Sequence, residues 1–124
     1  MAETKPAVAK VEAGKIEPAL KQVSGKLAGC KALRQSTILV HATGTGGGDF
    51  CLRATNQGVE LVSGAAMETP PSIEIIGDVR RIQSVLAGTK DARLLFLAGA
   101  FRLRGDLRYF SDLALELGII KEPL

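Results

Sequence analysis

The residues that most resemble a chemical motif are a run of glycines, Gly44-Thr45-Gly46-Gly47-Gly48. Backbone N–H groups free of side chains can cradle an anion, and phosphate-binding loops use them in this way. Such a loop needs a following Lys-Ser or Lys-Thr pair and a helix, and a dinucleotide fingerprint also needs the helix. Here residues 49–55 alternate as a strand does, and no lysine is near. The run is therefore predicted to be the loop of a β-hairpin.

His41 is the only histidine of the chain, and it lies in the β-branched run 36–43. A single imidazole does not make a metal site, and no Cys-x-x-Cys pair or nucleophile elbow accompanies it. Asp112 and Glu116 have helical i, i+4 spacing, which is more typical of a solvated helix face than of an acid–base pair. The sequence thus predicts no catalytic residue, no metal site and no cofactor, and we do not expect an enzyme.

The two cysteines, Cys30 and Cys51, are expected in a helix and a strand, far from redox or metal-binding spacing. We interpret both as reduced packing residues. The first ten residues contain no apolar core of a signal peptide, and no apolar run is long enough to span a bilayer. We therefore expect a soluble protein of the cytoplasm.

The amino-acid composition indicates which kind of ligand the protein could bind. Aromatic residues make up only 4% of the chain and Trp is absent, so the core must be aliphatic. A pocket with aliphatic walls suits an apolar ligand better than a nucleotide base, which would need stacking platforms. The net charge of +3 is spread over single and paired basic residues interleaved with acids, which does not predict a nucleic-acid surface. This net charge is compatible with weak attraction to anionic membranes.

Two segments are distinguished along the chain. Residues 1–15, rich in Ala, Lys, Glu and Pro, are expected to form a flexible tail. Residues 16–124 are expected to form one domain. Its first helix begins at Ile16, and apolar periodicity and turn residues predict the other elements: strands at 36–43, 49–55, 59–63, 72–77 and 100–104, and helices at 79–88, 91–98 and 107–118. Clustered strands followed by helices indicate an α+β domain.

Side-chain periodicity also predicts which residues face the core. Phe101 and Leu103 alternate with Arg102 and Arg104, so the apolar pair should face the helices and the arginines water. The run Leu94-Leu95-Phe96-Leu97 has no polar side, which predicts burial against two neighbours. The helix at 107–118 is the last element with only 119–124 to anchor it, and we expect it to act as a movable cover.

The ordered set of elements between Phe50 and Ile120 resembles the lipid-binding domain of the sterol carrier protein type two family. The resemblance rests on Phe50-Cys51-Leu52, the turn at Gly58, the strand Pro71-Ser72-Ile73-Glu74-Ile75, the helix from Val79 to Gly88, and Asp91 with its apolar helix. It ends with Gly99-Ala100-Phe101-Arg102-Leu103-Arg104-Gly105-Asp106 and an amphipathic helix. This glycine, strand, Gly-Asp and helix ending is the most specific part.

The resemblance implies a fold, a site and a ligand. The fold would be a five-stranded, mostly antiparallel sheet covered on one face by helices, with an apolar tunnel between the layers. The tunnel would bind a sterol, a fatty acid, a fatty acyl-CoA or a related lipid. The residues expected to line the tunnel are Phe50, Leu52, Leu61, Ile73, Ile75, Ile82, Leu86, Leu94, Leu95, Phe101, Leu103, Phe110 and Leu113. For each of them, burial in a dry core is about as good an explanation.

Three functions remain open at this stage. The first is a non-enzymatic carrier that binds and transfers or presents an apolar ligand, with transient contact to membranes or lipid-metabolising enzymes. The second is an accessory scaffold subunit that presents a lipid-like substrate, such as a prenylated quinone, to biosynthetic enzymes. The third is a cryptic enzyme, which the missing catalytic groups oppose. The sequence favours them in that order.

Overall fold

The computed structural model describes residues 16–64 and 70–124, so the tail expected at 1–15 lies outside the described residues. The predicted helices and strands are confirmed to within a few residues. In chain order they are α1 (Ile16–Leu27), β1 (Ser36–Thr43), β2 (Gly48–Thr55), β3 (Gly58–Ser63), β4 (Ile73–Asp78), α2 (Val79–Leu86), α3 (Ala92–Leu97), β5 (Phe101–Gly105) and α4 (Leu107–Leu117).

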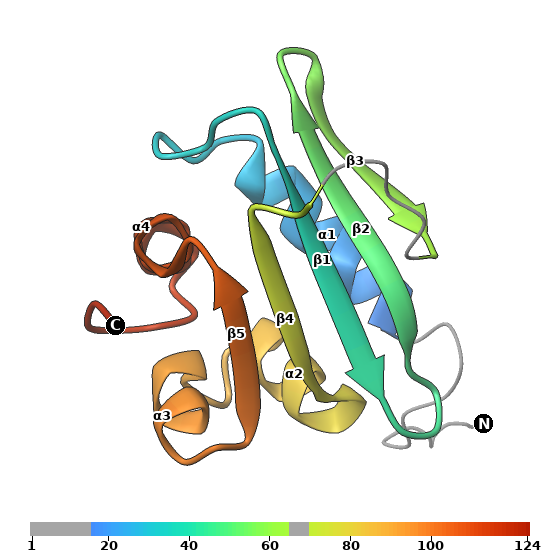
Figure 1. Ribbon diagram of the computed structural model, residues 1–124, viewed down its shortest axis with the longest axis vertical. Helices are drawn as coiled ribbons and strands as arrows, with labels where there is room; N and C mark the ends of the chain where they lie inside the picture. Colours follow the sequence, from blue (N-terminus) through green and yellow to red (C-terminus); the bar gives the residue numbers. More distant parts are fainter. Residues whose placement is uncertain (1–15, 65–69) are drawn as a thin grey trace, which may run out of the picture.

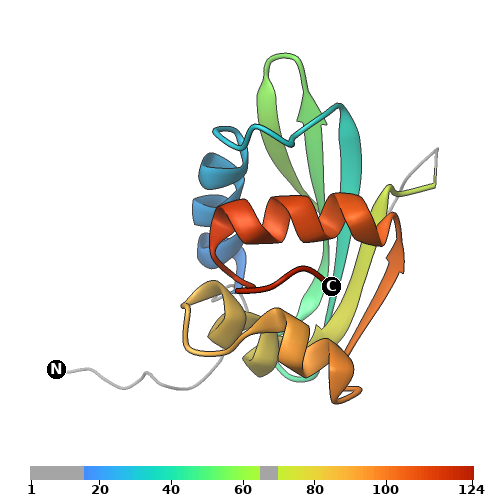
Figure 2. The same cartoon turned by 90° about the vertical axis from the view of Figure 1, so that its left-hand side faces the viewer.

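The strands form one open five-stranded sheet in the order β3-β2-β1-β4-β5. The first three strands are an antiparallel meander. β4 then lies beside β1 and runs parallel to it, and β5 pairs with β4 in antiparallel fashion. The sheet is therefore mixed but mostly antiparallel, as expected. The helices gather on one of its faces (Figures 1 and 2).

The glycine run forms the tight connection between β1 and β2, as predicted. The N–H of Gly47 donates to the carbonyl of Gly44 at 3.0 Å. A Cβ atom at position 47 would overlap the carbonyl oxygen of Ala42, so a side chain cannot be accommodated there. The glycine at this position is required by close approach of the backbone and not by an anion.

Aspartates begin three of the helices. The carboxylates of Asp78, Asp91 and Asp106 accept hydrogen bonds from the first free N–H groups of α2, α3 and α4. These N–H groups have no partner within the helix, which is why a short acceptor side chain stabilises the start. α4 ends at Gly118, whose φ of 79° is the left-handed conformation that favours glycine. The layer of helices is thus set by local signals.

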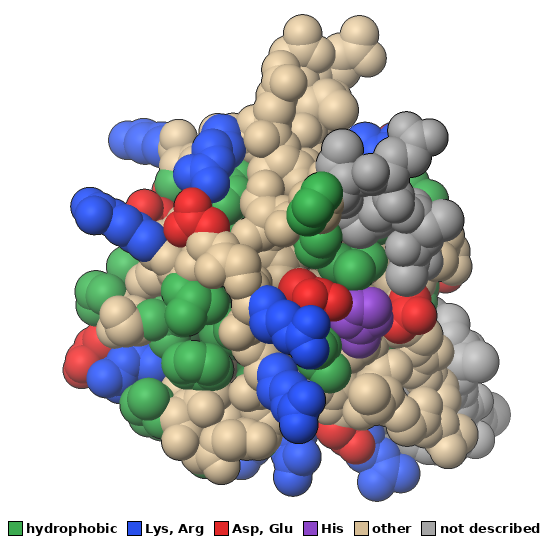
Figure 3. Space-filling view, in the orientation of Figure 1, with side chains coloured by type: hydrophobic (Ala, Val, Ile, Leu, Met, Phe, Trp, Pro, Cys, Tyr) green, Lys and Arg blue, Asp and Glu red, His purple; other side chains and the backbone are tan. Residues whose placement is uncertain are grey.

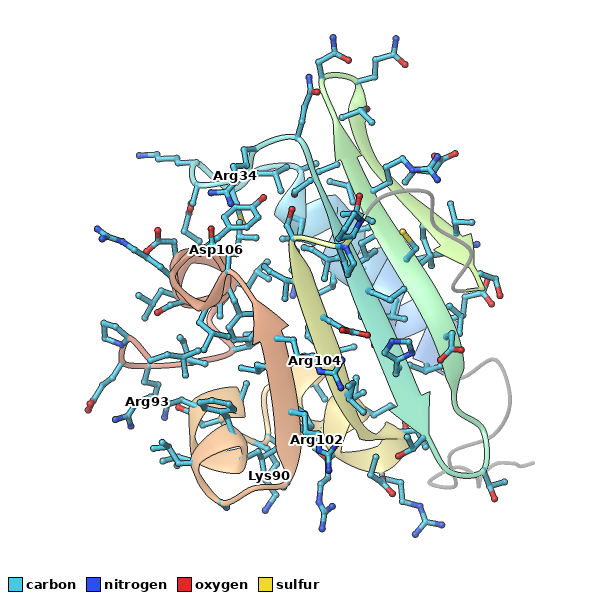
Figure 4. All side chains as sticks on the ribbon, in the orientation of Figure 1. Arg34, Lys90, Arg93, Arg102, Arg104 and Asp106 are labelled. Atoms are coloured by element: carbon cyan, nitrogen blue, oxygen red, sulfur yellow. The ribbon has the colours of Figure 1, made fainter. Side chains whose placement is uncertain are left out.

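The core lies between the sheet and the helices, and alternation along the strands divides the two sheet faces. Ile73 and Phe101 are buried on the helix side. Arg102 and Arg104 are exposed, as predicted, and Figure 4 shows them projecting from β5 on the opposite side. Among the described residues no helix is long and apolar enough to cross a membrane.

Candidate functional site

An apolar cavity of about 70 Å³ lies between the two layers. Sheet residues form one wall, and α1, α2, α4 and the adjoining segments form the other. Every lining side chain is aliphatic or a phenylalanine: Leu20, Val23, Leu27, Ile38, Val40, Leu52, Ile73, Ile75, Ile82, Val85, Leu86, Ala92, Phe101, Phe110, Leu113, Ala114, Leu117 and Ile119. Such a cavity can shelter a hydrocarbon and offers no group that could hold or transfer a proton.

Most of the residues that the sequence singled out lie on this cavity. They come from β2, β4, β5, α2 and α4, and they are Leu52, Ile73, Ile75, Ile82, Leu86, Phe101, Phe110 and Leu113. Four others pack in or against the core without lining the cavity: Phe50, Leu61, Leu95 and Leu103. Contact of any of them with a ligand stays a prediction.

Leu94 is placed differently from the expectation. Its side chain on α3 is 58% exposed, and Leu97 on the same helix is 63% exposed. The interpretation that this apolar run is buried against two neighbours is wrong for these two leucines, because α3 lies at the edge of the helical layer beside β5, an edge strand of the sheet (Figure 1). Leu95 and Phe96 are half-buried against the core. Only one side of the helix has a neighbour, so the other side stays open.

Half of the lining residues missing from the predicted set come from α1 and β1. Leu20, Val23 and Leu27 follow helical spacing in the sequence, and Ile38 and Val40 alternate with Leu39 and His41. Periodicity therefore contained the signal for a buried face. It did not show that β4 would return beside β1 and place these side chains at the centre of the sheet, next to the cavity.

The size of the cavity limits what it can hold as it stands. Pockets that bind drug-sized ligands usually measure about 300–1,000 Å³. A space of about 70 Å³ is far smaller. A long lipid could occupy it only if part of the helical layer moved away from the sheet.

The N-terminal end of α4 is firmly attached to the loop that precedes β1. Arg34 pairs with Asp106 at 2.8 Å and lies over the ring of Tyr109 at 3.9 Å (Figure 4). The hydroxyl group of Tyr109 shares a hydrogen bond of 2.8 Å with Ser36 and accepts one from the Arg34 N–H. The hydrogen bond from Arg34, helped by that from the Tyr109 N–H, holds the pKa of Asp106 below its usual value.

The C-terminal end of α4 is attached as well. The Glu116 carboxylate accepts hydrogen bonds from the N–H groups of Lys31 and Ala32 at 2.8 and 2.7 Å, which lower its pKa. Beyond the helix, the carbonyl of Ile119 accepts from the Ala92 N–H at 2.9 Å. The expectation that little anchors this helix is therefore wrong, and α4 is a poor candidate for the part that moves.

The histidine lies on the other face of the sheet, away from the cavity. His41 Nδ1 is 2.8 Å from Asp49 and Nε2 is 2.8 Å from Glu74, so the ring lies between two carboxylates. Figure 3 shows it flanked by acidic side chains. The hydrogen bond to Asp49 is the largest cause of its raised pKa, burial opposes it, and Glu74 adds to it. The two carboxylates thus contact opposite edges of the ring.

The described residues hold no group of three or more His, Cys, Asp or Glu side chains that could bind a metal ion. Cys30 and Cys51 are both free thiols. Burial is the largest cause of the raised pKa of each thiol, which disfavours the reactive thiolate. The chemistry of the site is therefore that of its apolar cavity.

The structure is a mixed five-stranded sheet with helices on one face and an apolar cavity between the two layers. Neither a protein-family model nor a curated protein matches the sequence. Solved structures do match. A palmitated SCP2L2 from Aedes aegypti aligns over 82% of this chain and 93% of its own, with a TM-score of 0.62 and 11% identity.

Two further structures extend the comparison. Sterol carrier protein 2 from Yarrowia lipolytica, in its apo form, covers 93% of this chain and 94% of its own, with a TM-score of 0.59 and 16% identity. The ubiquinone synthesis protein UbiJ-SCP2 covers 86% and 81%, with a TM-score of 0.52 and 15% identity. The chain has the fold of sterol carrier protein 2 domains, as the sequence pattern predicted.

Proposed function

We propose that this protein binds a single lipid between its sheet and its helices and carries or presents it without chemical change. The observation that carries the proposal is the cavity whose lining side chains are all apolar and lie within the sterol carrier protein 2 fold. A fatty acid, a fatty acyl-CoA or a sterol fits this chemistry. Two unpaired cysteines support action in the reducing cytoplasm.

The same lining supports a carrier over an enzyme. Acid–base or nucleophilic catalysis needs a polar side chain within reach of the bound molecule, and the lining of this cavity has none. Burial of each methylene group contributes about 0.8 kcal/mol. A long chain thus offers on the order of ten kcal/mol, which must offset the loss of ligand freedom and the opening of the layers.

Displacement of a fluorescent long-chain fatty acid or sterol tests the proposal. We expect saturable binding of one probe per chain and its displacement by unlabelled lipid. Native mass spectrometry of the purified protein, with organic extraction, should identify the bound molecule. If no long-chain probe, charged or neutral, binds to the folded protein, the carrier function is wrong.

The scaffold function is a second candidate, favoured by the similarity in fold to UbiJ-SCP2. Both functions would use the same cavity. They differ in that a scaffold subunit is bound in an enzyme complex, whereas a carrier is free. Affinity purification from cells with mass spectrometry distinguishes them, since a scaffold is recovered with biosynthetic enzymes in fixed ratio and a carrier is recovered alone.

The exposed side of α3 supports contact with an anionic membrane. Leu94 and Leu97 are exposed on it, and Lys90 and Arg93 come from the same segment, with Arg93 Nε donating to the Pro123 carbonyl at 3.1 Å (Figure 4). Hydrophobic side chains gather on this part of the surface in Figure 3. Two leucines expose far less than the roughly 800 Å² per partner of a stable protein interface. Leucines framed by cations instead suit a lipid surface, where they can insert singly.

A further inference from the structure

A second concave feature lies on the outer side of the helical layer. α1 and α2 are neighbours on the covered face of the sheet (Figures 1 and 2). Between them is an open groove of about 470 Å³, lined by Ala19, Gln22, Arg80, Gln83, Ser84, Leu86, Ala87 and Thr89. Unlike the cavity, the groove is lined about equally by polar and apolar surface, and its volume lies in the range of small-molecule sites.

The groove and the cavity share one side chain. Leu86, at the end of α2, lines both the apolar cavity inside and the groove outside. It is half-buried, whereas Ile82 and Val85 on the same helix are buried. Leu86 is the residue common to both linings among those that the structure describes, so the two spaces meet at this side chain.

The charge of the groove selects among ligands. Among the described residues of its lining Arg80 is the only charged one, and its side chain is exposed. None of the salt bridges between described residues involves Arg80. Its backbone N–H is held by Asp78 at 2.7 Å, which fixes the first turn of α2 below it. Gln22 and Gln83 add amide groups that donate hydrogen bonds, whereas the Thr89 hydroxyl already donates to the Ser84 carbonyl at 3.1 Å.

We infer that this groove is the mouth of the cavity and binds the anionic headgroup of a single-chain lipid beside Arg80, while the apolar chain passes Leu86 into the cavity. The inference rests on the proposed carrier function. Arg80 and Leu86 are separated along α2 by roughly 9 Å at 1.5 Å per residue. The headgroup thus stays in water while the chain is buried. α1 and α2 are the elements that separate when the cavity expands.

Arg80 is tested with a matched neighbour. Arg81 is exposed on the same helix but does not line the groove, so Arg80→Gln and Arg81→Gln change the same charge. A long-chain fatty acid and the alcohol of equal length serve as ligands. We expect Arg80→Gln to weaken binding of the acid about fivefold to tenfold, the latter equal to about 1.4 kcal/mol, with less than a twofold effect on the alcohol. Arg81→Gln should change neither.

Leu86 is tested against Leu117, which is also half-buried and lines the cavity from α4. Truncation to Ala removes similar contact with a bound chain in both cases. We expect Leu86→Ala to accelerate association and release of the fluorescent acid severalfold in stopped-flow experiments, whereas Leu117→Ala accelerates release alone. Faster association in Leu117→Ala and not in Leu86→Ala places the mouth at α4 and overturns the inference.

The outcomes separate this inference from the proposed function. Equal losses in Arg80→Gln and Arg81→Gln, or equal losses of acid and alcohol in Arg80→Gln, overturn the headgroup site while lipid binding itself stands. Failure of both acid and alcohol to bind the unaltered protein overturns the carrier function and the mouth together.

Discussion

At Gly105 a left-handed backbone conformation and the close approach of another segment coincide. Its φ of 96° is left-handed, and a Cβ atom there would overlap the carbonyl oxygen of Ser72. The same carbonyl accepts the N–H of Asp106, which begins α4. The glycine therefore allows β5 and β4 to lie close together where the chain turns into the last helix.

Replacement of Gly105 by alanine should destabilise the folded protein more than its positive φ alone would predict. Gly88 is also left-handed, with a φ of 83°, but a Cβ atom there would meet nothing within 4 Å. We expect Gly88→Ala to lower the free energy of unfolding by about 1–2 kcal/mol, and Gly105→Ala to lower it by at least about 2 kcal/mol more. Urea denaturation measures both, and equal losses would show that no close approach exists.

The histidine between two carboxylates makes stability depend on pH. The pKa of folded His41 is raised, first by Asp49 on β2 and further by Glu74 on β4, which also lies 3.6 Å from Arg104 on β5. Its pKa in the unfolded chain is near 6.5. The folded state binds the proton more tightly, so the stabilisation is complete below about pH 6.5 and is lost as the pH rises through the raised pKa.

Thermal denaturation of the protein and of His41→Gln between about pH 5.5 and about pH 8.5 checks this. The series begins about one pH unit below the pKa of histidine in the unfolded chain. The melting temperature of the unaltered protein should exceed that of the variant most at the acidic end, and the difference should shrink as the pH rises. A difference that stays constant or grows with pH would contradict a protonated histidine between the two carboxylates.

At the scale of elements, the attachments of α4 indicate that α2 is the helix that yields. α4 is joined at both ends to the loop before β1 through Arg34 and Glu116. α2 is shorter and borders the groove. In the empty protein we expect the amides of residues 79–86 to exchange with solvent faster than those of 107–117, because the side-chain hydrogen bonds of α2 between described residues are all local and none ties it to another element.

Hydrogen exchange read by mass spectrometry measures both helices, and a bound fatty acid should protect α2 more than α4. As a control, Glu116→Gln removes a charged acceptor at α4 and should accelerate exchange in α4 with little change in α2. Fast exchange confined to α4, with protection by lipid there alone, would restore the last helix as the cover.

The edge position of α3 predicts how the protein meets a membrane. We expect sedimentation with vesicles of phosphatidylcholine and phosphatidylglycerol, weakened by salt because cations such as Lys90 and Arg93 contribute. Each leucine that inserts contributes about 1.5–3 kcal/mol. The double substitution Leu94→Ser and Leu97→Ser should therefore weaken vesicle binding more than tenfold.

Leu115 provides the control for α3. It is 37% exposed on α4, where the surface hollow around it is lined by two carboxylates, Asp112 and Glu116, and by Lys31. Leu115→Ser should leave vesicle binding within twofold of the unaltered protein. An equal loss in both variants, or no binding of the unaltered protein to anionic vesicles, would remove α3 as the contact surface.

For the molecule as a whole, most of the correct structural predictions came from short-range patterns in the sequence. Strand alternation placed Ile73, Ile75 and Phe101 on the helix side, and the aspartates and glycines marked where helices begin and end. These features depend on a few neighbouring residues. The family pattern then supplied the layer arrangement, which the structure confirms.

What the sequence could not predict depends on residues distant in the chain. The exposure of Leu94 follows from the edge position of β5, and the attachment of α4 follows from contacts between residues such as Arg34 and Asp106. The shared position of Leu86 likewise needs α1 beside α2. Periodicity indicates which side of an element is apolar, but it does not indicate which partner covers that side.

The small cavity itself gives the last prediction, since filling it should separate stability from lipid binding. Ala114 on α4 is 1% exposed and lines the cavity. In Ala114→Val the two added methyl groups occupy empty space, and this gain roughly offsets the lower helix propensity, so the free energy of unfolding should change by less than about 1 kcal/mol.

A bound chain needs that same space, so Ala114→Val should lose most of the stabilisation by lipid. For the unaltered protein a long-chain fatty acid at a hundred times its Kd contributes about 2.7 kcal/mol, which raises the melting temperature by several degrees. Ala42→Val is the control, because Ala42 is buried in β1 but does not line the cavity. It should keep the full rise in melting temperature with lipid, whatever its own stability. If Ala114→Val is raised by lipid as much as Ala42→Val, the lipid does not lie between the sheet and α4.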